Sequence, residues 1–253
     1  MADDRYAHSA IKVDELYARG VRDGEAEVSL ETSASELAVR VGGPFTIWHP
    51  EKVEGAFVLT FDCLVVDETA KMLLLFHAIG DDGESVVDWE RDGSYFCYTT
   101  QMQNYTLGIN RGAHSGVSQF SYFDAEGRDD VCNLRRLGYY GWSPDHLAKV
   151  REEVEEIKKT NPAAKMWNSP TWLEWNRVST LCSAREPEAG LNRWFTHRIR
   201  CLPPYIEYSV NDVLVFEVVD HYESPLTEGY IGFRCMSPGK AFRLRNIDLG
   251  VAK

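Results

Sequence analysis

Phe57-Val58-Leu59-Thr60-Phe61-Asp62-Cys63-Leu64-Val65-Val66 reads as one long β-strand, because it is rich in β-branched and aromatic residues and lacks a helical period. The next apolar run, Met72 to Ala78, ends at Gly80 and an Asp81-Asp82-Gly83 turn, which is typical of a central strand covered on both faces. Similar runs follow at short, regular spacing with turn residues between them. This rhythm predicts an all-β sandwich or barrel, and 253 residues suit a single domain covering residues 1–253.

Further strands are expected in both halves of the chain. Residues 27–41 alternate loosely and predict one or two strands, whereas residues 1–26 are charged and weakly patterned. Asn211-Asp212 fits a two-residue hairpin turn. The last strands must pair with early ones, as Greek-key topology requires. The other expected strands are residues 95–99, 105–111, 117–123, 131–137, 197–202, 205–210, 213–219, 230–235 and 241–249.

Residues 143–197 interrupt this pattern and predict an inserted helical segment. Ser143 fits an N-cap, Pro144 fits the first helical position, and Asn161-Pro162 fits a stop. The segment carries one apolar helical stripe and then a Trp-rich tail. Two interpretations stay open, a helix packed on the edge of the sandwich and a lid beside a binding site. The stripe is Leu147, Val150, Val154 and Ile157, and the tail holds Trp167, Trp172, Trp175 and Trp194.

The strands between Tyr95 and Arg136 carry polar and aromatic residues where a core strand would carry aliphatic ones. Aromatic rings pack on the apolar faces of sugars, and amide and guanidinium groups bind hydroxyls and carboxylates. The stretch therefore predicts a sugar-binding face. The candidate substrate-binding residues, including two from flanking segments, are Trp48, Arg91, Tyr105, Arg111, His114, Tyr122 and Asn133.

Strand alternation divides the Arg-rich part of this face. Asn133 and Arg135 share one side of their strand, and Leu134 and Arg136 share the other. We therefore expect Arg135 inside the cleft with Asn133, and Arg136 outside it. Tyr98 is expected to join Arg135 as a catalytic group from a neighbouring strand.

Asp88 and Glu90 are further catalytic candidates. In a strand Asp88, Glu90 and Asp92 would point the same way, and paired carboxylates serve as nucleophile and general acid in retaining glycosidases. An exposed acidic turn is the alternative.

His77 follows in phase with Leu73 and Leu75, so it is either a proton shuttle at the edge of the polar face or a hydrogen-bonded core histidine.

Net charge and cysteine spacing exclude several classes of protein. A net charge of −12 with no basic stripe argues against a nucleic-acid partner, and no apolar run is long enough to span a bilayer. The six cysteines form no C-x-x-C pair, which argues against a zinc site and for a reducing compartment. We expect a cytoplasmic protein, with a periplasmic or secreted one whose signal peptide has been removed as the alternative. No cofactor or catalytic metal is expected, and a structural Ca²⁺ at Asp81 and Asp82 stays open.

Six short segments resemble the YesU-like proteins, a bacterial family of unknown function. The most specific are Asn133-Leu134-Arg135-Arg136 and Ile231-Gly232-Phe233-Arg234-Cys235-Met236. The resemblance covers most of the chain outside residues 143–197, where this chain departs from the family. The other matching segments are residues 45–50, 76–80, 88–95 and 121–123, and the second of the specific segments is followed by Arg245-Asn246-Ile247.

The resemblance implies a fold and a general area of function. The implied fold is a concanavalin A-like jelly-roll β-sandwich, here with an inserted helical segment. The family is associated with bacterial use of acidic plant polysaccharides, so an oligosaccharide ligand is implied. We expect a carbohydrate-active enzyme that works by β-elimination or glycoside hydrolysis in the concave sheet cleft, and a non-catalytic lectin-like module is the alternative. The oligomeric state is left open.

Overall fold

The structure is a computed structural model, and twelve segments of the chain are described in it. They are residues 5–31, 35–66, 71–80, 83–88, 91, 93, 101–110, 131–137, 144–164, 168–185, 192–235 and 238–253.

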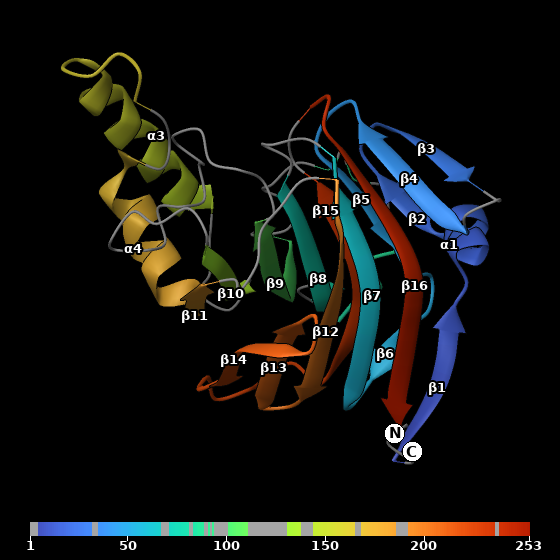
Figure 1. Ribbon diagram of the computed structural model, residues 1–253. Coiled ribbons are helices and arrows are strands. Elements are labelled where there is room, and N and C mark those ends of the chain that lie inside the picture. Colours follow the sequence, from blue (N-terminus) through green and yellow to red (C-terminus); the bar gives the residue numbers. More distant parts are fainter. Residues whose placement is uncertain are drawn as a thin grey trace.

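Two antiparallel sheets pack face to face (Figure 1). The back sheet has the strand order β14-β13-β12-β7-β16-β4-β3, and β1 pairs with β16 beside this path. A short helix, α1 (Val13–Arg19), connects β1 to the other sheet. The strands of the back sheet are β1 (Tyr6–Ile11), β3 (Ala26–Glu31), β4 (Glu36–Val41), β7 (Phe57–Val65), β12 (Trp194–Leu202), β13 (Tyr205–Val210), β14 (Val213–Val219) and β16 (Ala241–Ala252).

The front sheet has the strand order β11-β10-β9-β8-β15-β5-β2, and β6 pairs with β15. We call the side of this sheet that faces away from the back sheet its outer face. The strands are β2 (Val21–Asp23), β5 (Phe45–Trp48), β6 (Val53–Glu54), β8 (Lys71–Gly80), β9 (Met102–Asn110), β10 (Val131–Leu137), β11 (Thr180–Arg185) and β15 (Glu228–Cys235).

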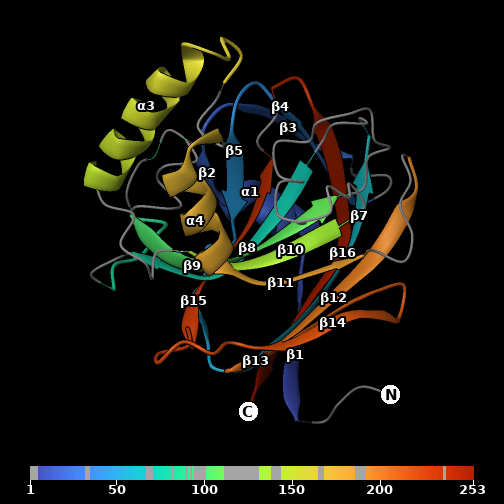
Figure 2. The same cartoon turned by 90° about the vertical axis from the view of Figure 1, so that its left-hand side faces the viewer.

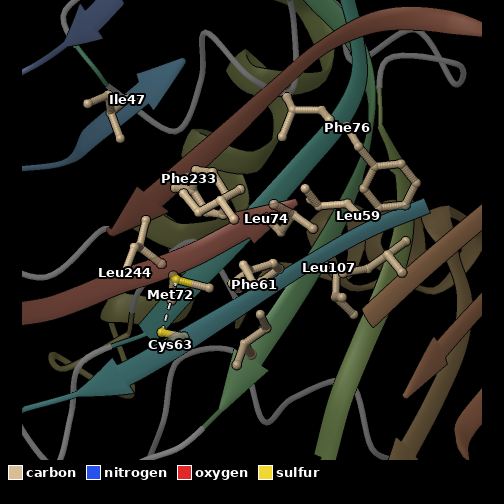
Figure 3. Packing of buried hydrophobic residues seen from close by; sticks show 14 of the residues in the cluster. Ile47, Leu59, Phe61, Cys63, Met72, Leu74, Phe76, Leu107, Phe233 and Leu244 are labelled. Carbon is tan, nitrogen blue, oxygen red and sulfur yellow. Dashed lines mark hydrogen bonds between the residues drawn. The ribbon is translucent and has the colours of Figure 1, made fainter. Parts of the chain in front are cut away.

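One large apolar core fills the space between the sheets (Figure 3). Phe61 of β7 and Phe233 of β15 meet edge to face with ring centroids 5.2 Å apart, so the two sheets contact through aromatic rings as well as aliphatic side chains. Cys63 Sγ lies 3.4 Å from Met72 Sδ across the same core. The fold prediction is confirmed: the chain is an all-β sandwich, and its two central apolar runs are the central strands β7 and β8.

The ends of the chain meet in the back sheet. β16 lies between β7 and β4, and β1 pairs along β16 from Tyr6 opposite Ala252 to Ile11 opposite Ile247. The first and last strands are therefore neighbours (Figure 1), and the late strand β16 pairs with the early strands β4 and β7, as the Greek-key prediction requires. β1 itself was not predicted, because only its first and last residues are buried and the four between them are exposed, which hides any alternation.

Two helices stand on the outer side of the front sheet at its β10–β11 end (Figures 1 and 2). α3 (Pro144–Lys158) is the predicted helix, and α4 (Pro170–Ser179) is a second one that the pattern did not predict. The stripe residues Val150 and Val154 pack with Trp172, Trp175 and Leu137 of β10. The ring centroids of Trp172 and Trp175 are 4.9 Å apart. Trp172 and Trp175 therefore attach the helices to the sheet. No helix of the described chain is long and apolar enough to cross a membrane.

Ser169 connects the two helices. Its hydroxyl accepts from the backbone N–H of Trp172 (3.0 Å) as the N-cap of α4, and donates to Glu153 of α3 (2.5 Å). We expect Ser169→Ala to lower the free energy of unfolding by ~1–2 kcal/mol, because one buried N–H loses its acceptor. Urea unfolding measures this. Thr160→Ala, at the exposed end of α3, is the control, and equal losses in both variants would contradict the capping role.

Candidate functional site

Strand register places two rows of residues on the outer face of the front sheet. Residues directly opposite one another on paired strands share a face, and their neighbours in sequence point into the core. The first row is Asp23, Thr46, Arg234, Leu73, Gly108, Asn133 and Ser183, and the second is Val21, Trp48, Gly232, Leu75, Thr106, Arg135 and Thr180.

One half of this face, over β2, β5 and β15, is occupied by a buried polar cluster. The Asp23 carboxylate is 1% exposed and accepts from Trp48 Nε1 (2.6 Å) and Arg91 Nε (2.9 Å). Arg91 also donates to the Val86 carbonyl, and its guanidinium lies 5.5 Å from the centroid of the Trp48 ring. We call Asp23, Trp48 and Arg91 the Asp23 cluster. It attaches Val86 and Arg91 to the sheet.

Two neighbouring residues of β15 complete this attachment. Arg234 donates to Thr46 Oγ1 (3.0 Å) and to the Gly93 carbonyl (2.7 Å). Gly232 lies under Trp48, and a Cβ at this position would come within 2.6 Å of the indole ring. Glycine is thus required for Trp48 to lie flat on the strand. Trp48 and Arg91, predicted to bind sugar, are buried here and hold one chain segment against another.

The other half of the outer face, over β9 and β10, carries a polar strip that we define as Asn104, Thr106 and Arg135. Thr106 lies opposite Arg135, and its hydroxyl donates to Asn104 Oδ1 (2.6 Å). Thr106 and Arg135 are each 6% exposed, and Asn104 is fully buried. Asn133 lies on the same side of β10 as Arg135, as predicted. The side chain of Asn133 lies outside the described part of the structure.

Apolar clusters border the polar strip on both sides. On the β8–β15 side lies a cluster that includes Trp48, Leu75 and Val86, and on the β10 side Leu137 packs under α3 and α4. A guanidinium, a hydroxyl and an amide are therefore gathered between two apolar walls. Such an arrangement can bind a carboxylate and adjacent hydroxyls with little competition from water.

Tyr105 lies in the interior of the sandwich, which corrects the expectation that it belongs to the sugar-binding face. Its hydroxyl donates to Asp220 (2.5 Å) and accepts from the Leu226 N–H (3.1 Å). Burial and the adjacent Asp220 carboxylate raise the pKa of Tyr105. Arg136 lies opposite Tyr105 with its Nε 3.7 Å from Asp220, so it lies inside the core, on the side away from Arg135. These groups hold residues 220–226 against the front sheet.

His77 is a hydrogen-bonded core histidine, which agrees with one of its two interpretations and corrects its predicted phase. β8 has an irregularity between Phe76 and Ile79, and His77 adopts a φ of 46°. The ring therefore turns away from the face of Leu73 and Leu75. Its centroid is 5.1 Å from that of Phe57, and Nδ1 donates to the Leu226 carbonyl (3.0 Å). Burial lowers the pKa of His77 from 6.5 to about 4, which keeps the imidazole neutral near pH 7.

This shift predicts a pH-dependent stability. Between pH 4 and pH 6.5 the unfolded state protonates His77 and the folded state does not. The contribution of His77 is therefore complete above about pH 6.5, and on the order of 3 kcal/mol is lost as the pH falls toward 4. His77→Asn, which tolerates a positive φ, should flatten this part of the profile of unfolding free energy against pH. Parallel profiles for both proteins would contradict the prediction.

The remaining predicted residues lie at or beyond the limits of the described segments. Asp88 is exposed, and it follows a turn at residues 86–87 instead of lying in a strand, which agrees with the acidic-turn alternative. Glu90, Tyr98, Arg111, His114 and Tyr122 lie outside the described residues, as do Asp81 and Asp82. In the part of the chain that the structure describes, no group of three or more His, Cys, Asp or Glu residues could hold a metal ion.

Sequence reasoning did not single out Asp23, Asn104 or Asp220. Arg234 was noted only within a motif of the family resemblance. The available signal for Arg234 was a charged residue inside the apolar run from Ile231 to Cys235. A buried arginine almost always has a partner, but the partner could not be read from the sequence.

Comparisons with known proteins support the fold and the family resemblance. No family model matches the chain. The uncharacterized protein YesU of Bacillus subtilis (strain 168) is 23% identical over 228 residues, which cover 87% of this chain and 83% of YesU. A crystal structure of a Bacillus subtilis protein of unknown function with a galectin-like fold matches with a TM-score of 0.68 and 18% identity, over 98% of this chain and 100% of that one.

A third similarity is to the carbohydrate recognition domain of Emp46p in its potassium-bound form. The TM-score is 0.53 and the identity 8%, over 92% of this chain and 88% of that one. These similarities confirm the resemblance of the chain to YesU-like proteins and its concanavalin A-like, galectin-like sandwich fold.

Proposed function

We propose, from the similarity to YesU-like proteins and from the polar strip, that this protein binds an acidic oligosaccharide on the outer face of its front sheet. One observation carries the proposal: Arg135, Thr106 and Asn104 lie together between two apolar walls. The Arg135 guanidinium would bind a sugar carboxylate through two parallel hydrogen bonds. The Thr106 hydroxyl would accept from a neighbouring sugar hydroxyl, and the fully buried Asn104 holds the Thr106 hydroxyl in place.

One further observation supports a carbohydrate ligand. Emp46p, which shares this fold, has a domain named for carbohydrate recognition. The net charge of −12 does not prevent binding of an anionic ligand, because salt confines the repulsion from the acidic groups to roughly 10 Å. A buried arginine on the floor of the site can therefore select for an acid locally.

We also propose catalysis, by β-elimination or hydrolysis, as the second candidate function of the same face. Asp88 supports it, since this acid is exposed and follows Val86, which the Asp23 cluster holds against the sheet. Glu90 and Tyr98 would complete the set of proposed catalytic residues. His77 and Tyr105 have no part in this proposal, because both are buried in the core on the opposite side of the front sheet.

A screen of acidic plant and algal oligosaccharides tests both candidates. Calorimetry measures binding, ultraviolet absorbance detects the unsaturated product of elimination, and a reducing-end assay detects hydrolysis. Binding without turnover supports a lectin-like module, and binding with turnover supports an enzyme. If neutral oligosaccharides bind and acidic ones do not, the proposed role of Arg135 is contradicted. If no sugar binds, the whole proposal is contradicted.

A further inference from the structure

Residues 220–226 connect the back sheet to the front sheet. The backbone N–H of Asp220 donates to the Pro204 carbonyl (2.8 Å) in the turn between β12 and β13. The Asp220 carboxylate is buried, and it accepts from the hydroxyl of Tyr105 on β9 (2.5 Å) and from the backbone N–H of Tyr222 (3.0 Å). Tyr222 therefore lies beside a residue that is bonded to both sheets.

Tyr222 also contacts the C-terminal end of α4. Tyr222 is 7% exposed, and its hydroxyl donates to the Val178 carbonyl. Val178 lies in the last turn of α4, where the carbonyls have no N–H partner within the helix. The Tyr222 hydroxyl therefore supplies a partner for one of these carbonyls and fixes the end of the helix to residues 220–226.

The end of α4 leads directly into β11 beside Arg135 (Figure 1). Thr180 is both the C-cap residue of α4 and the first residue of β11, and it lies opposite Arg135 on β10. The register shifts next to this pair, because β11 has one extra residue, Leu181, there. A bulge locally disrupts the ladder of hydrogen bonds between two strands. The position of Arg135 relative to α4 therefore depends on how firmly the α4–β11 junction is held.

We propose that Tyr222 positions Arg135 for recognition of an acid by fixing the α4–β11 junction, a role that rests on the proposed function of the polar strip. The carbonyl that its hydroxyl binds lies two residues before Thr180, the cross-strand neighbour of Arg135. A guanidinium forms two parallel hydrogen bonds with a carboxylate only in a defined orientation. A junction that is held in place therefore favours acidic ligands over neutral ones, which need no such orientation.

Tyr222→Phe tests this role, because it removes the hydroxyl and keeps the buried ring. The acidic probes are trisaccharides of galacturonic acid and of glucuronic acid, and their carboxyl-reduced forms are the neutral counterparts. Calorimetric titrations give the ratio of acidic to neutral affinity. This ratio should fall by about threefold to tenfold in Tyr222→Phe, which corresponds to the loss of one neutral hydrogen bond. A solely structural role would weaken binding of both forms equally and leave the ratio unchanged.

Tyr208→Phe is the matched control. Tyr208 is also a buried tyrosine, and its hydroxyl lies 2.8 Å from Nδ1 of His197 in the back sheet, away from the polar strip. This variant should keep the wild-type ratio, and an equal fall in both variants would contradict the positioning role. Thermal melts establish that both variants are folded at the temperature of the titrations.

Hydrogen exchange without any sugar supplies a second reading. The amides of β11 (Thr180–Arg185) should exchange faster in Tyr222→Phe than in wild type, and unchanged exchange there would overturn the inference. Arg135→Ala separates a failure of this inference from a failure of the proposed function. If Arg135→Ala removes the preference for acid and Tyr222→Phe keeps it, only the positioning role is contradicted. If the wild type binds neither acidic probe, or Arg135→Ala keeps the preference, the proposed function is contradicted as well.

Discussion

Asp23→Ala is expected to lower the free energy of unfolding by about 3–5 kcal/mol. Asp23 is buried, and its carboxylate accepts from Arg91 at 2.9 Å and from Trp48 at 2.6 Å. Its removal leaves a buried guanidinium without this carboxylate and a buried indole N–H without its acceptor. Loss of one member of a buried ion pair costs much more than loss of a surface pair, because the remaining charge keeps its desolvation penalty.

Chemical denaturation with far-ultraviolet circular dichroism measures this loss. Asp88→Ala is the control, because it removes an exposed acid three residues from Arg91, and it should change stability by less than about 0.5 kcal/mol. Asp23→Ala should also alter Trp fluorescence, since the indole of Trp48 loses a charged neighbour. A loss below about 1 kcal/mol for Asp23→Ala would show that the Asp23 cluster does not hold Val86 and Arg91 to the sheet.

Arg135→Ala is expected to weaken binding of an acidic oligosaccharide by about tenfold to a hundredfold. A hydrogen bond to a charged group contributes about 1.5–3 kcal/mol, and one factor of ten corresponds to about 1.4 kcal/mol. Arg135→Lys should fall between wild type and Arg135→Ala, because lysine keeps the charge and loses the two parallel hydrogen bonds. Calorimetric titrations at fixed salt concentration give the three affinities.

Arg200→Ala is the matched control for Arg135→Ala. Arg200 lies on β12 of the back sheet, so its loss changes the net charge equally without touching the polar strip. Equal weakening by the two substitutions would mean that only net charge matters. Since Arg135 is buried, thermal melts must establish the folded fraction of each variant at the temperature of the titrations.

Among the described residues, the sequence predicted most strands because their patterns are local. The strands expected over residues 95–99 and 117–123 lie outside the described residues. The hairpin at Asn211-Asp212 was predicted from turn chemistry alone, and both residues have the positive φ that this turn needs. α3 was predicted from its start, stripe and stop. α4 was not, because Trp residues at helical spacing were interpreted as a tail, whereas they are the face that packs on α3 and β10.

The candidate site was harder to predict because it depends on which face a residue occupies. Simple alternation correctly separated Arg135 from Arg136. It failed at His77, where one irregularity in β8 moved the ring from the outer face into the core. Partners distant in sequence were also invisible in the sequence. Asp23 of β2 pairs with Arg91, and Tyr105 of β9 pairs with Asp220, only because the fold brings segments far apart in the sequence into contact.

Hydrogen exchange with and without a bound acidic oligosaccharide tests the central claim most directly. It reads the position of the ligand along the backbone and needs no mutation. If sugar binds on the polar strip, amide protection should increase in β9 (Met102–Asn110) and β10 (Val131–Leu137) and stay unchanged in β12 (Trp194–Leu202) and β13 (Tyr205–Val210). Protection confined to the back sheet, with β9 and β10 unaffected, would contradict the account.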